Sequence, residues 1–258
     1  MGADNPSMHR DVFIARLDEL LTPRLFTDYC PNGLQVEGKD EIRVVVTGVT
    51  ASLALILEAA AKGADALVVH HGIFWNGTVP LVRGSHKRRV EALLDHGITL
   101  LGYHLPLDRH PEVGNNAPAL RDLGLIDLAP FASHKGTPIG WKGRFEVPVT
   151  SEAFAHRVAA YYGRPPVSFM HGPRKISTVG MVSGAAQGDL AIAVEDKLDA
   201  FVTGEVSEAQ FHLAQEEGIH FLSVGHHASE RVGPRALATW ITNNLGVEAT
   251  FVDIENPV

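Results

Sequence analysis

One arrangement recurs along this chain of 258 residues and restricts its fold. A helical stretch ends in glycine, an apolar run follows, and the run stops at polar or histidine-rich residues. The arrangement occurs at residues 59–71, 93–104 and 215–227. Glycine suits such a helix end because it adopts a left-handed backbone without a Cβ penalty. Short, almost continuously apolar strands are typical of a mainly parallel sheet with helices on both faces, so we expect an α/β fold.

Helix starts and further strands agree with this expectation. Ser52, Ser85 and Ser207 stand where an N-cap oxygen could accept backbone N–H groups, and Gln210 gives Ser207 the spacing of a capping box. We expect additional strands at residues 42–46, 179–182, 198–202 and 249–252. Helices are expected at 152–162 and 234–245, the second followed by Gly246.

The domain organisation is predicted from a change in composition. Prolines and glycines between residues 128 and 148 interrupt any long helix. We therefore place a boundary near residue 130. Residues 1–130 plus 225–258 would form a metal-binding α/β domain, and residues 131–224 a second α/β domain. The first seven residues are polar and without pattern, so no helix or strand is expected there.

Charge and composition disfavour several functional classes. Lys and Arg number 22 against 30 Asp and Glu, a net charge of −8, which opposes binding to nucleic acid or an anionic membrane. The basic run at residues 86–89 is short and is expected to be a solvated helix face. No apolar stretch is long enough for a membrane span and no signal peptide is recognisable. With the single cysteine, Cys30, we expect a cytoplasmic protein and a small buried thiol.

Histidines and carboxylates follow the ends of predicted strands. They are His70-His71, then His104 with Asp108, then His226-His227 with Glu230. In open parallel sheets, side chains beyond the carboxyl ends of strands converge on one crevice. Adjacent histidines point to opposite faces of a regular strand, so we expect the strand to end before His70 and His71. This convergence predicts a metal site.

The donor set indicates which metals such a site would bind. Imidazole nitrogens and carboxylate oxygens without a thiolate suit zinc, iron, manganese or cobalt better than calcium or magnesium. So many donors exceed the three ligands of a mononuclear catalytic zinc, and two divalent ions would use them all. A single histidine at a strand end is more often a capping group. The common position of the clusters after apolar runs is what favours metal binding.

Five motifs resemble the Nif three-like family, whose members often carry the label GTP cyclohydrolase I type 2 homologue. The motifs are Asn32-Gly33-Leu34-Gln35-Val36-Glu37-Gly38, His70-His71-Gly72-Ile73-Phe74-Trp75, Tyr103-His104-Leu105-Pro106-Leu107-Asp108, Thr203-Gly204-Glu205 and Gly225-His226-His227-Ala228-Ser229-Glu230. The resemblance implies two similar α/β lobes, a dinuclear centre and a toroidal homohexamer. It places the metal ligands on His70, His71, Asp108, His226 and Glu230. His104 is left open as a ligand or a nearby base.

Other residues can be interpreted in a functional or in a structural way. Glu205 could orient a ligand histidine, act as a base, or be a carboxylate favoured by a helix N-terminus. The N–H groups of Ser183-Gly184-Ala185-Ala186 could hold an anion such as a phosphate, although a plain strand–helix turn is expected. Trp75 could stack on a heteroaromatic substrate or pack in a core or subunit contact. Asn32-Gly33 needs nothing beyond turn chemistry.

The leading hypothesis is a metal-dependent hydrolase that uses metal-activated water on a nucleotide or related small molecule. His104, His227 or Glu205 would move protons. A cyclohydrolase would attack a guanine ring, and a dinuclear phosphoesterase would use the same metals on a phosphate ester. The rival from another class is a non-enzymatic metal-binding scaffold or regulatory hexamer. Zinc, iron or manganese is the expected metal in each case.

Overall fold

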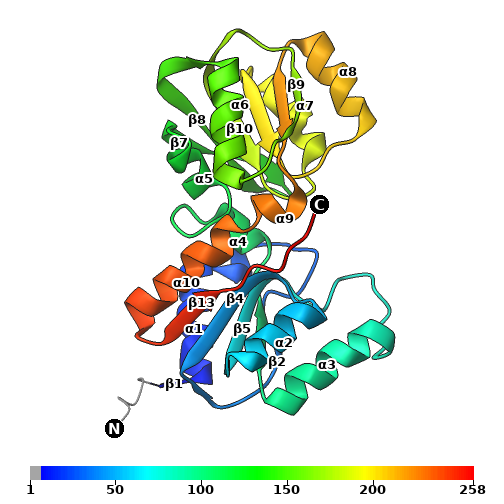
Figure 1. Ribbon diagram of the computed structural model, residues 1–258, viewed down its shortest axis with the longest axis vertical. Coiled ribbons are helices and arrows are strands. Elements are labelled where there is room, and N and C mark those ends of the chain that lie inside the picture. The colour runs from blue at the N-terminus through cyan, green and yellow to red at the C-terminus, as the bar shows by residue number, and fades with distance from the viewer. Residues whose placement is uncertain (1–6) are drawn as a thin grey trace. The chain divides into compact units, whose positions relative to one another are not determined.

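The computed structural model describes residues 7–258, and these divide into two compact units (Figure 1). Unit 1 comprises the chain up to Leu107 together with Gly233–Glu255. Unit 2 comprises Asp108–Val232 and Asn256–Val258. Both units are α/β, with helices beside a sheet, as the sequence predicts. The expectation for the first residues falls largely on residues 1–6, which lie outside the described part of the chain.

Unit 1 is built on a sheet with a parallel centre. Its order is β13 (Glu248–Phe251), β4 (Val44–Thr50), β5 (Ala66–His71), β6 (Thr99–Gly102) and β2 (Gly33–Val36). Neighbouring strands are parallel except β2, which pairs antiparallel with β6. A small separate sheet joins β1 (Met8–His9) to β3 (Glu41–Ile42). The other elements are α1 (Arg10–Leu21), η1 (Pro23–Leu25), α2 (Leu53–Ala61), α3 (Gly84–His96), α4 (Leu105–Arg109) and α10 (Val232–Leu245), of which α4 and α10 begin or end in unit 2.

The helices α2 and α3 of unit 1 lie side by side next to the sheet (Figure 1). Leu55 and Ile56 of α2 and Leu93 of α3 are buried in one core with the strand residue Leu67. Ser52 caps α2, because its hydroxyl accepts the N–H of Leu55 at 3.2 Å. The same prediction is wrong for Ser85, which lies inside α3, whose N-cap residue is Arg83. Gly97 ends α3 with a φ of 63°, the left-handed conformation expected of it.

Unit 2 has a mixed sheet. Its order is β7 (Ile126–His134), β8 (Thr137–Thr150), β10 (Lys175–Val182), β11 (Ala200–Thr203), β12 (His220–Ser223) and β9 (Val167–Met170). Only the pairs β10–β11 and β11–β12 in this sheet of the described chain are parallel. Its other elements are α5 (Ala117–Asp122), α6 (Ser151–Tyr162), η2 (Gln187–Asp189), α7 (Leu190–Glu195), α8 (Glu208–Glu217) and α9 (His226–Ser229). The expectation of a mainly parallel sheet therefore does not describe unit 2.

The segment rich in Pro and Gly forms the antiparallel hairpin of β7 and β8. Pro130, where a domain boundary was expected, pairs with Trp141 within this hairpin. The chain passes from unit 1 to unit 2 between Leu107 and Asp108, and it returns to unit 1 between Val232 and Gly233. Proline and glycine interrupt helices, but a long β-hairpin tolerates them at bulges and edges. The division into a metal-binding domain and a second α/β domain stays a prediction.

An aspartate, buried in unit 1 and partly buried in unit 2, stands at matching positions of the two sheets. Asp65, just before β5, accepts the N–H groups of Arg43 and Val44 at 2.9 and 3.1 Å. Asp199, just before β11, accepts those of Ser177 and Thr178 at 2.7 and 3.0 Å. Each carboxylate thus fixes the start of the strand beside its own. As for membranes, no helix in residues 7–258 combines the length and the apolar character of a bilayer crossing.

Candidate metal centre

Unit 1 gathers three imidazoles at the carboxyl ends of β5 and β6. His70 and His71 are the last residues of β5, and His104 follows β6 before α4 begins. One ring nitrogen from each lies within 4.8 Å of the other two. The expectation that the strand ends before the histidine pair is wrong, because β5 runs to His71. The rings of His70 and His71 nevertheless lie 4.5 Å apart between centroids.

The Nδ1 atoms of the strand histidines contact other parts of unit 1. His70 is fully buried, and its Nδ1 lies 3.1 Å from the carbonyl oxygen of Tyr103. A carbonyl only accepts hydrogen bonds, so this Nδ1 carries the hydrogen, and in the neutral ring Nε2 carries the lone pair. His71 Nδ1 lies 3.0 Å from the hydroxyl of Thr50 at the end of β4. This use of one ring nitrogen is the arrangement that orients metal-ligating histidines.

His104 is held by residues that precede β2. Its Nδ1 lies 2.7 Å from Oδ1 of Asp28, and its backbone N–H donates to Oδ1 of Asn32 at 2.8 Å. Burial alone would raise the pKa of Asp28, but hydrogen bonds from His104, Asn32 and Tyr29, with the charge of His104, lower it below its usual value. Trp75 lies beside both His104 and His71, with ring centroids 5.4 and 5.7 Å away.

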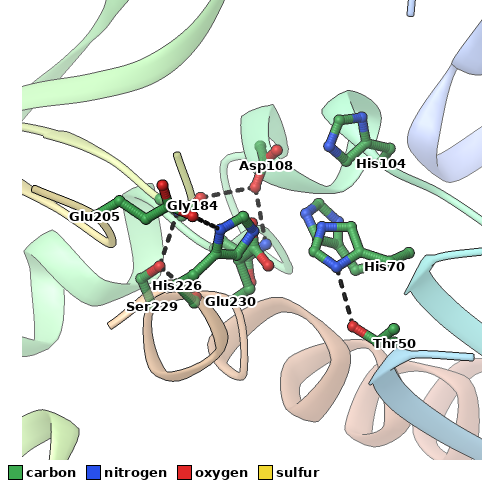
Figure 2. Close-up of polar contacts among 12 residues, drawn as sticks. Thr50, His70, His104, Asp108, Gly184, Glu205, His226, Ser229 and Glu230 are labelled. Carbon is green, nitrogen blue, oxygen red and sulfur yellow. Dashed lines mark hydrogen bonds and ion pairs between the residues drawn. The ribbon is translucent and has the colours of Figure 1, made fainter. Parts of the chain in front are cut away.

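In unit 2, His226 lies between two carboxylates (Figure 2). Its Nδ1 is 2.7 Å from Oε1 of Glu205, and its Nε2 is 3.1 Å from Oε1 of Glu230, which is 2% exposed. Burial would lower the pKa of His226, but the hydrogen bonds and charges of Glu230 and Glu205 outweigh burial and raise it to about 9. Of the roles considered for Glu205, its contact supports that of orienting a ligand histidine.

Asp108, also in unit 2, is buried and belongs to a polar network. Its Oδ1 accepts the hydroxyl of Ser183 at 2.7 Å and the side-chain amide of Asn115 at 2.9 Å. The Ser183 N–H donates to Asn116 at 2.8 Å, and the next N–H, of Gly184, donates to Ser229 Oγ at 2.9 Å. Both of these N–H groups are therefore used within the protein and are not available to an anion.

Gly184, next to Ser183 of the Asp108 network, lies close to the His226–Glu230 pair. Its φ is +70°, and a Cβ at this position would lie 2.4 Å from Glu230 Oε1 and 3.3 Å from His226 Nε2. The turn after β10 therefore approaches the two donor atoms so closely that a Cβ here would displace the Glu230 carboxylate. Figure 2 shows Gly184, Asp108, His226, Glu230 and Ser229 of unit 2.

The donors fit a transition metal within each unit. His226 Nε2 and Glu230 Oε1, 3.1 Å apart, match two ligands of one tetrahedral zinc, which bond lengths of about 2.1 Å place about 3.4 Å apart. In unit 1, the close ring nitrogens of His70, His71 and His104 offer the soft-to-borderline donors that zinc and iron prefer. Buried His, Asp and Glu groups of this chain could therefore hold a metal ion.

Three further predictions concern His227, Cys30, whose Sγ lies within 4.8 Å of donor atoms of Asp28 and His104, and the basic run. His227 follows His226 on α9, where successive side chains point about 100° apart, whereas Glu230 at the fourth position beyond shares the face of His226. Cys30 is a buried thiol, and burial and the charge of Asp28 raise its pKa to about 12. Lys87 in the basic run pairs with Glu91 on an exposed helix face, as expected.

Sequence reasoning missed several residues that hold the donors in place. They are Asp28, Thr50, Asn115, Asn116 and Ser229. Some of their contacts cross long stretches of chain, such as the 76 positions between Asp28 and His104, whereas Asn115 lies seven positions from Asp108. Two signals were available: Asn32, in the first recognised motif, lies four residues after Asp28, and Ser229 lies inside the fifth motif.

Comparisons with known proteins agree over almost the whole chain. The profile of the family described as Duf34/NIF3 (NGG1p interacting factor 3) matches residues 8–257. A Vibrio cholerae protein named GTP cyclohydrolase 1 type 2 homolog is 45% identical over 246 residues, 95% of this chain and 97% of its own. An Escherichia coli K12 protein of the same name is 44% identical over 242 residues, covering 93% and 96%.

Solved structures show the same fold. A protein titled ybgI, of unknown function, has a TM-score of 0.92 and 42% identity, with 97% of this chain and 100% of that chain covered. A protein from Thermus thermophilus has a TM-score of 0.89 and 38% identity, with the same coverage. Reduced HcgD from Methanocaldococcus jannaschii has a TM-score of 0.86 at 21% identity, covers 97% and 100%, and supports the fold alone.

Proposed function

Because the chain belongs to the Duf34/NIF3 family, we propose that it is a dinuclear metal-dependent hydrolase acting on a nucleotide or related small molecule. The observation that carries the proposal is the common orientation of the imidazoles. His70 and His104 each direct Nδ1 to a carbonyl or carboxylate oxygen, so that in the neutral rings Nε2 has the lone pair for a metal or a proton, and His226 directs Nδ1 to Glu205 while Nε2 lies beside Glu230.

We propose the five metal ligands that the family resemblance implies. They are His70, His71, Asp108, His226 and Glu230. Each ligand histidine has a partner that fixes its ring, and each carboxylate is buried. Buried carboxylates are costly unless they are paired or coordinate metal. This favours occupancy by two divalent ions, with zinc, iron or manganese as candidates.

The two units would be the two similar α/β lobes that the family resemblance implies. Val45 pairs with Ala66 in unit 1 as Val179 pairs with Ala200 in unit 2, and Ala66 pairs with Thr99 as Ala200 pairs with His220. Counting along these registers gives His71 and Glu205 equivalent positions, at the end of the central strand or just beyond it. A ligand in unit 1 and the residue that orients a ligand in unit 2 thus stand at corresponding strand ends.

In the proposed reaction, bound divalent ions would lower the pKa of a water molecule and polarise the electrophile. The residues of the chain would orient the donors and move protons. Glu205 holds His226 through Nδ1 at 2.7 Å and so positions it. His104 is the proton carrier that we favour, because its ring lies within 4.9 Å of His70 and 5.6 Å of His71 between centroids. His227 lies on another face of α9 and is the weaker candidate.

A planar ring is the substrate feature that the site could recognise. Tyr29, 45% exposed, and partly exposed Trp75 both contact the ring of His104. Aromatic faces of this kind stack on heteroaromatic rings, and the names of the relatives point to a guanine nucleotide. A nucleotide is therefore the first substrate class to test, and a simple phosphate ester the second.

The test combines metal content with activity. We expect about two transition-metal ions per chain by elemental analysis of zinc- or manganese-loaded protein, and hydrolysis of a compound in a panel of guanine nucleotides and phosphate esters. A variant with His70→Ala and His71→Ala should lose both. A loaded protein with near-zero metal would refute the dinuclear centre. Full metal content with no activity on any substrate would favour the non-enzymatic scaffold.

The homohexamer stays a prediction of the family resemblance. Light scattering of the metal-loaded protein should give a mass near six times 27.8 kDa. A monomer at micromolar concentration would remove the ring from the proposal without affecting the assignment of metal ligands.

A further inference from the structure

His104 differs from its neighbours in the unit 1 imidazole cluster in the partner of its Nδ1 atom. Nδ1 of His70 lies beside a carbonyl and that of His71 beside a hydroxyl, whereas Nδ1 of His104 lies 2.7 Å from the carboxylate of Asp28. The Asp28 side chain is 1% exposed and the His104 side chain 14% exposed. Asp28 lies outside the regular elements, before β2. Its position therefore has to be fixed by hydrogen bonds.

Those hydrogen bonds surround the Asp28 carboxylate. Oδ1 accepts the N–H of Tyr29 at 2.6 Å as well as the ring of His104. Oδ2 accepts the side-chain amide of Asn32 at 2.8 Å and the N–H of Leu105 at 3.0 Å. Asn76 adds two further bonds to this loop, from its N–H to the carbonyl of Tyr29 and from Nδ2 to that of Asp28. Both oxygens of the carboxylate are consequently held in place.

Asn32 completes the arrangement around His104. Its Nδ2 donates to Asp28, and its Oδ1 accepts the backbone N–H of His104 at 2.8 Å. The backbone on both sides of His104 and the ring itself are therefore bound to one pair of side chains. Turn chemistry alone, which explains Asn32-Gly33 in the sequence, does not require these contacts.

An ionised carboxylate can only accept hydrogen bonds. Nδ1 of His104 must then carry a hydrogen, and in the neutral ring Nε2 is the atom with the lone pair. The same logic underlies the carboxylate–histidine pairs of hydrolases, in which the carboxylate selects the tautomer and stabilises the charged ring.

We propose that Asp28 and Asn32 are positioning residues that hold His104 as the Nδ1–H tautomer, with Nε2 as the proton acceptor for hydrolysis. This rests on the proposed function. In the step, the oxygen of a water molecule bonds to the electrophilic atom of the substrate while its proton passes to Nε2. The ring then carries hydrogens on both nitrogens beside the Asp28 carboxylate. It returns the Nε2 proton to the leaving group when the substrate bond breaks.

The test compares Asp28→Asn with the wild type. An amide can turn its NH₂ group toward Nδ1, which favours hydrogen on Nε2 and removes the acceptor. We expect kcat to fall at least about tenfold, the lower part of what positioned acid–base groups contribute, with KM and metal content nearly unchanged. Asp28→Glu keeps a carboxylate and should recover part of kcat, which a merely structural role would not predict.

The control is Asp65→Asn, which removes another buried carboxylate of unit 1 that binds backbone N–H groups. It should lower stability and leave kcat unchanged. Nitrogen NMR of zinc-loaded, ¹⁵N-histidine-labelled protein gives a readout that needs no substrate. The His104 signals, identified by their loss in His104→Gln, should show hydrogen on Nδ1 in the wild type and not in Asp28→Asn.

Three results would overturn the proposal. They are hydrogen on Nε2 in the wild type, an unchanged kcat in Asp28→Asn, and a metal content that falls together with kcat, which would make His104 a ligand. Should the wild type hydrolyse nothing, the hydrolase proposal fails by itself. The His104 tautomer is then still decided by NMR, so the two failures are distinguishable.

Discussion

Replacing Gly184 with alanine tests whether the turn after β10 places Glu230 for metal binding. The added Cβ would lie 2.4 Å from Glu230 Oε1, and ordinary contact begins near 3.4 Å, so the oxygen must retreat by about 1 Å. A metal ligand has to stay within about 0.2 Å of its bonding distance. The displacement is several times that tolerance, and we expect zinc affinity to fall by about 10- to 100-fold or more.

The matched control is Gly163→Ala. Gly163 has a φ of +71°, against +70° for Gly184, but its Cβ would meet nothing within 4 Å. Both substitutions impose the left-handed backbone on alanine, at about 1–2 kcal/mol. In Gly184→Ala the colliding atom is the end of a side chain, which can move at less cost than backbone. The free energies of unfolding of the two metal-free variants should therefore be similar.

Two measurements decide the outcome. Chemical denaturation of metal-free protein reports the shared backbone strain, and calorimetric zinc titration reports the ligand geometry. We expect Gly163→Ala to bind zinc like the wild type and Gly184→Ala to bind it weakly. Equal zinc affinities for the two variants would refute the reasoning, because Glu230 would then not need the position that Gly184 allows.

Two further changes test other parts of the chain. Glu230→Gln should lower the occupancy of both metal ions in elemental analysis if the carboxylate bridges them, because a neutral amide is a poorer ligand; loss of one ion only would indicate a terminal ligand. Asp65→Asn should lower the free energy of unfolding of metal-free protein at pH 7 by about 1–3 kcal/mol. Burial would raise the pKa of Asp65, but Lys39 and two backbone N–H groups lower it, so this stabilisation is present above about pH 4 and is lost as pH falls through the folded-state pKa. A difference between the wild type and Asp65→Asn that persisted undiminished in denaturation at pH values of about 2–3 would contradict this.

The regular elements were predictable where local chemistry decides them. The expected strand at 179–182 lies inside β10, and the expected helices at 152–162 and 234–245 correspond to α6 and α10. Ser52 and Gly97 act as predicted because a cap depends on residues a few positions apart. The hairpin of β7 and β8 was missed because its pairing depends on non-local register, which Pro and Gly content does not reveal.

The candidate site was predictable to the extent that its donors follow apolar strands. His70, His104 and His226 occupy such positions, and periodicity locates them. Their partners Asp28 and Ser183 lie in a loop and a turn, with no repeating pattern to reveal them. Only the folded backbone brings Asp28 to His104, and Ser183 to Asp108.

The corresponding strand ends explain why one unit supplies a ligand where the other supplies an orienting group. In both units, the end of the central parallel strand contacts the end of the neighbouring strand or the turn just after it. In unit 1, Thr50 at the end of β4 contacts His71. In unit 2, the carbonyl of Gly184, just after β10, accepts the N–H of Glu205. An imidazole at this position has a nitrogen to offer directly. A flexible glutamate reaches instead to Nδ1 of His226 at 2.7 Å. The backbone pattern therefore fixes where side chains emerge, whereas the length and chemistry of each side chain decide whether it can bind a metal or must hold the residue that does.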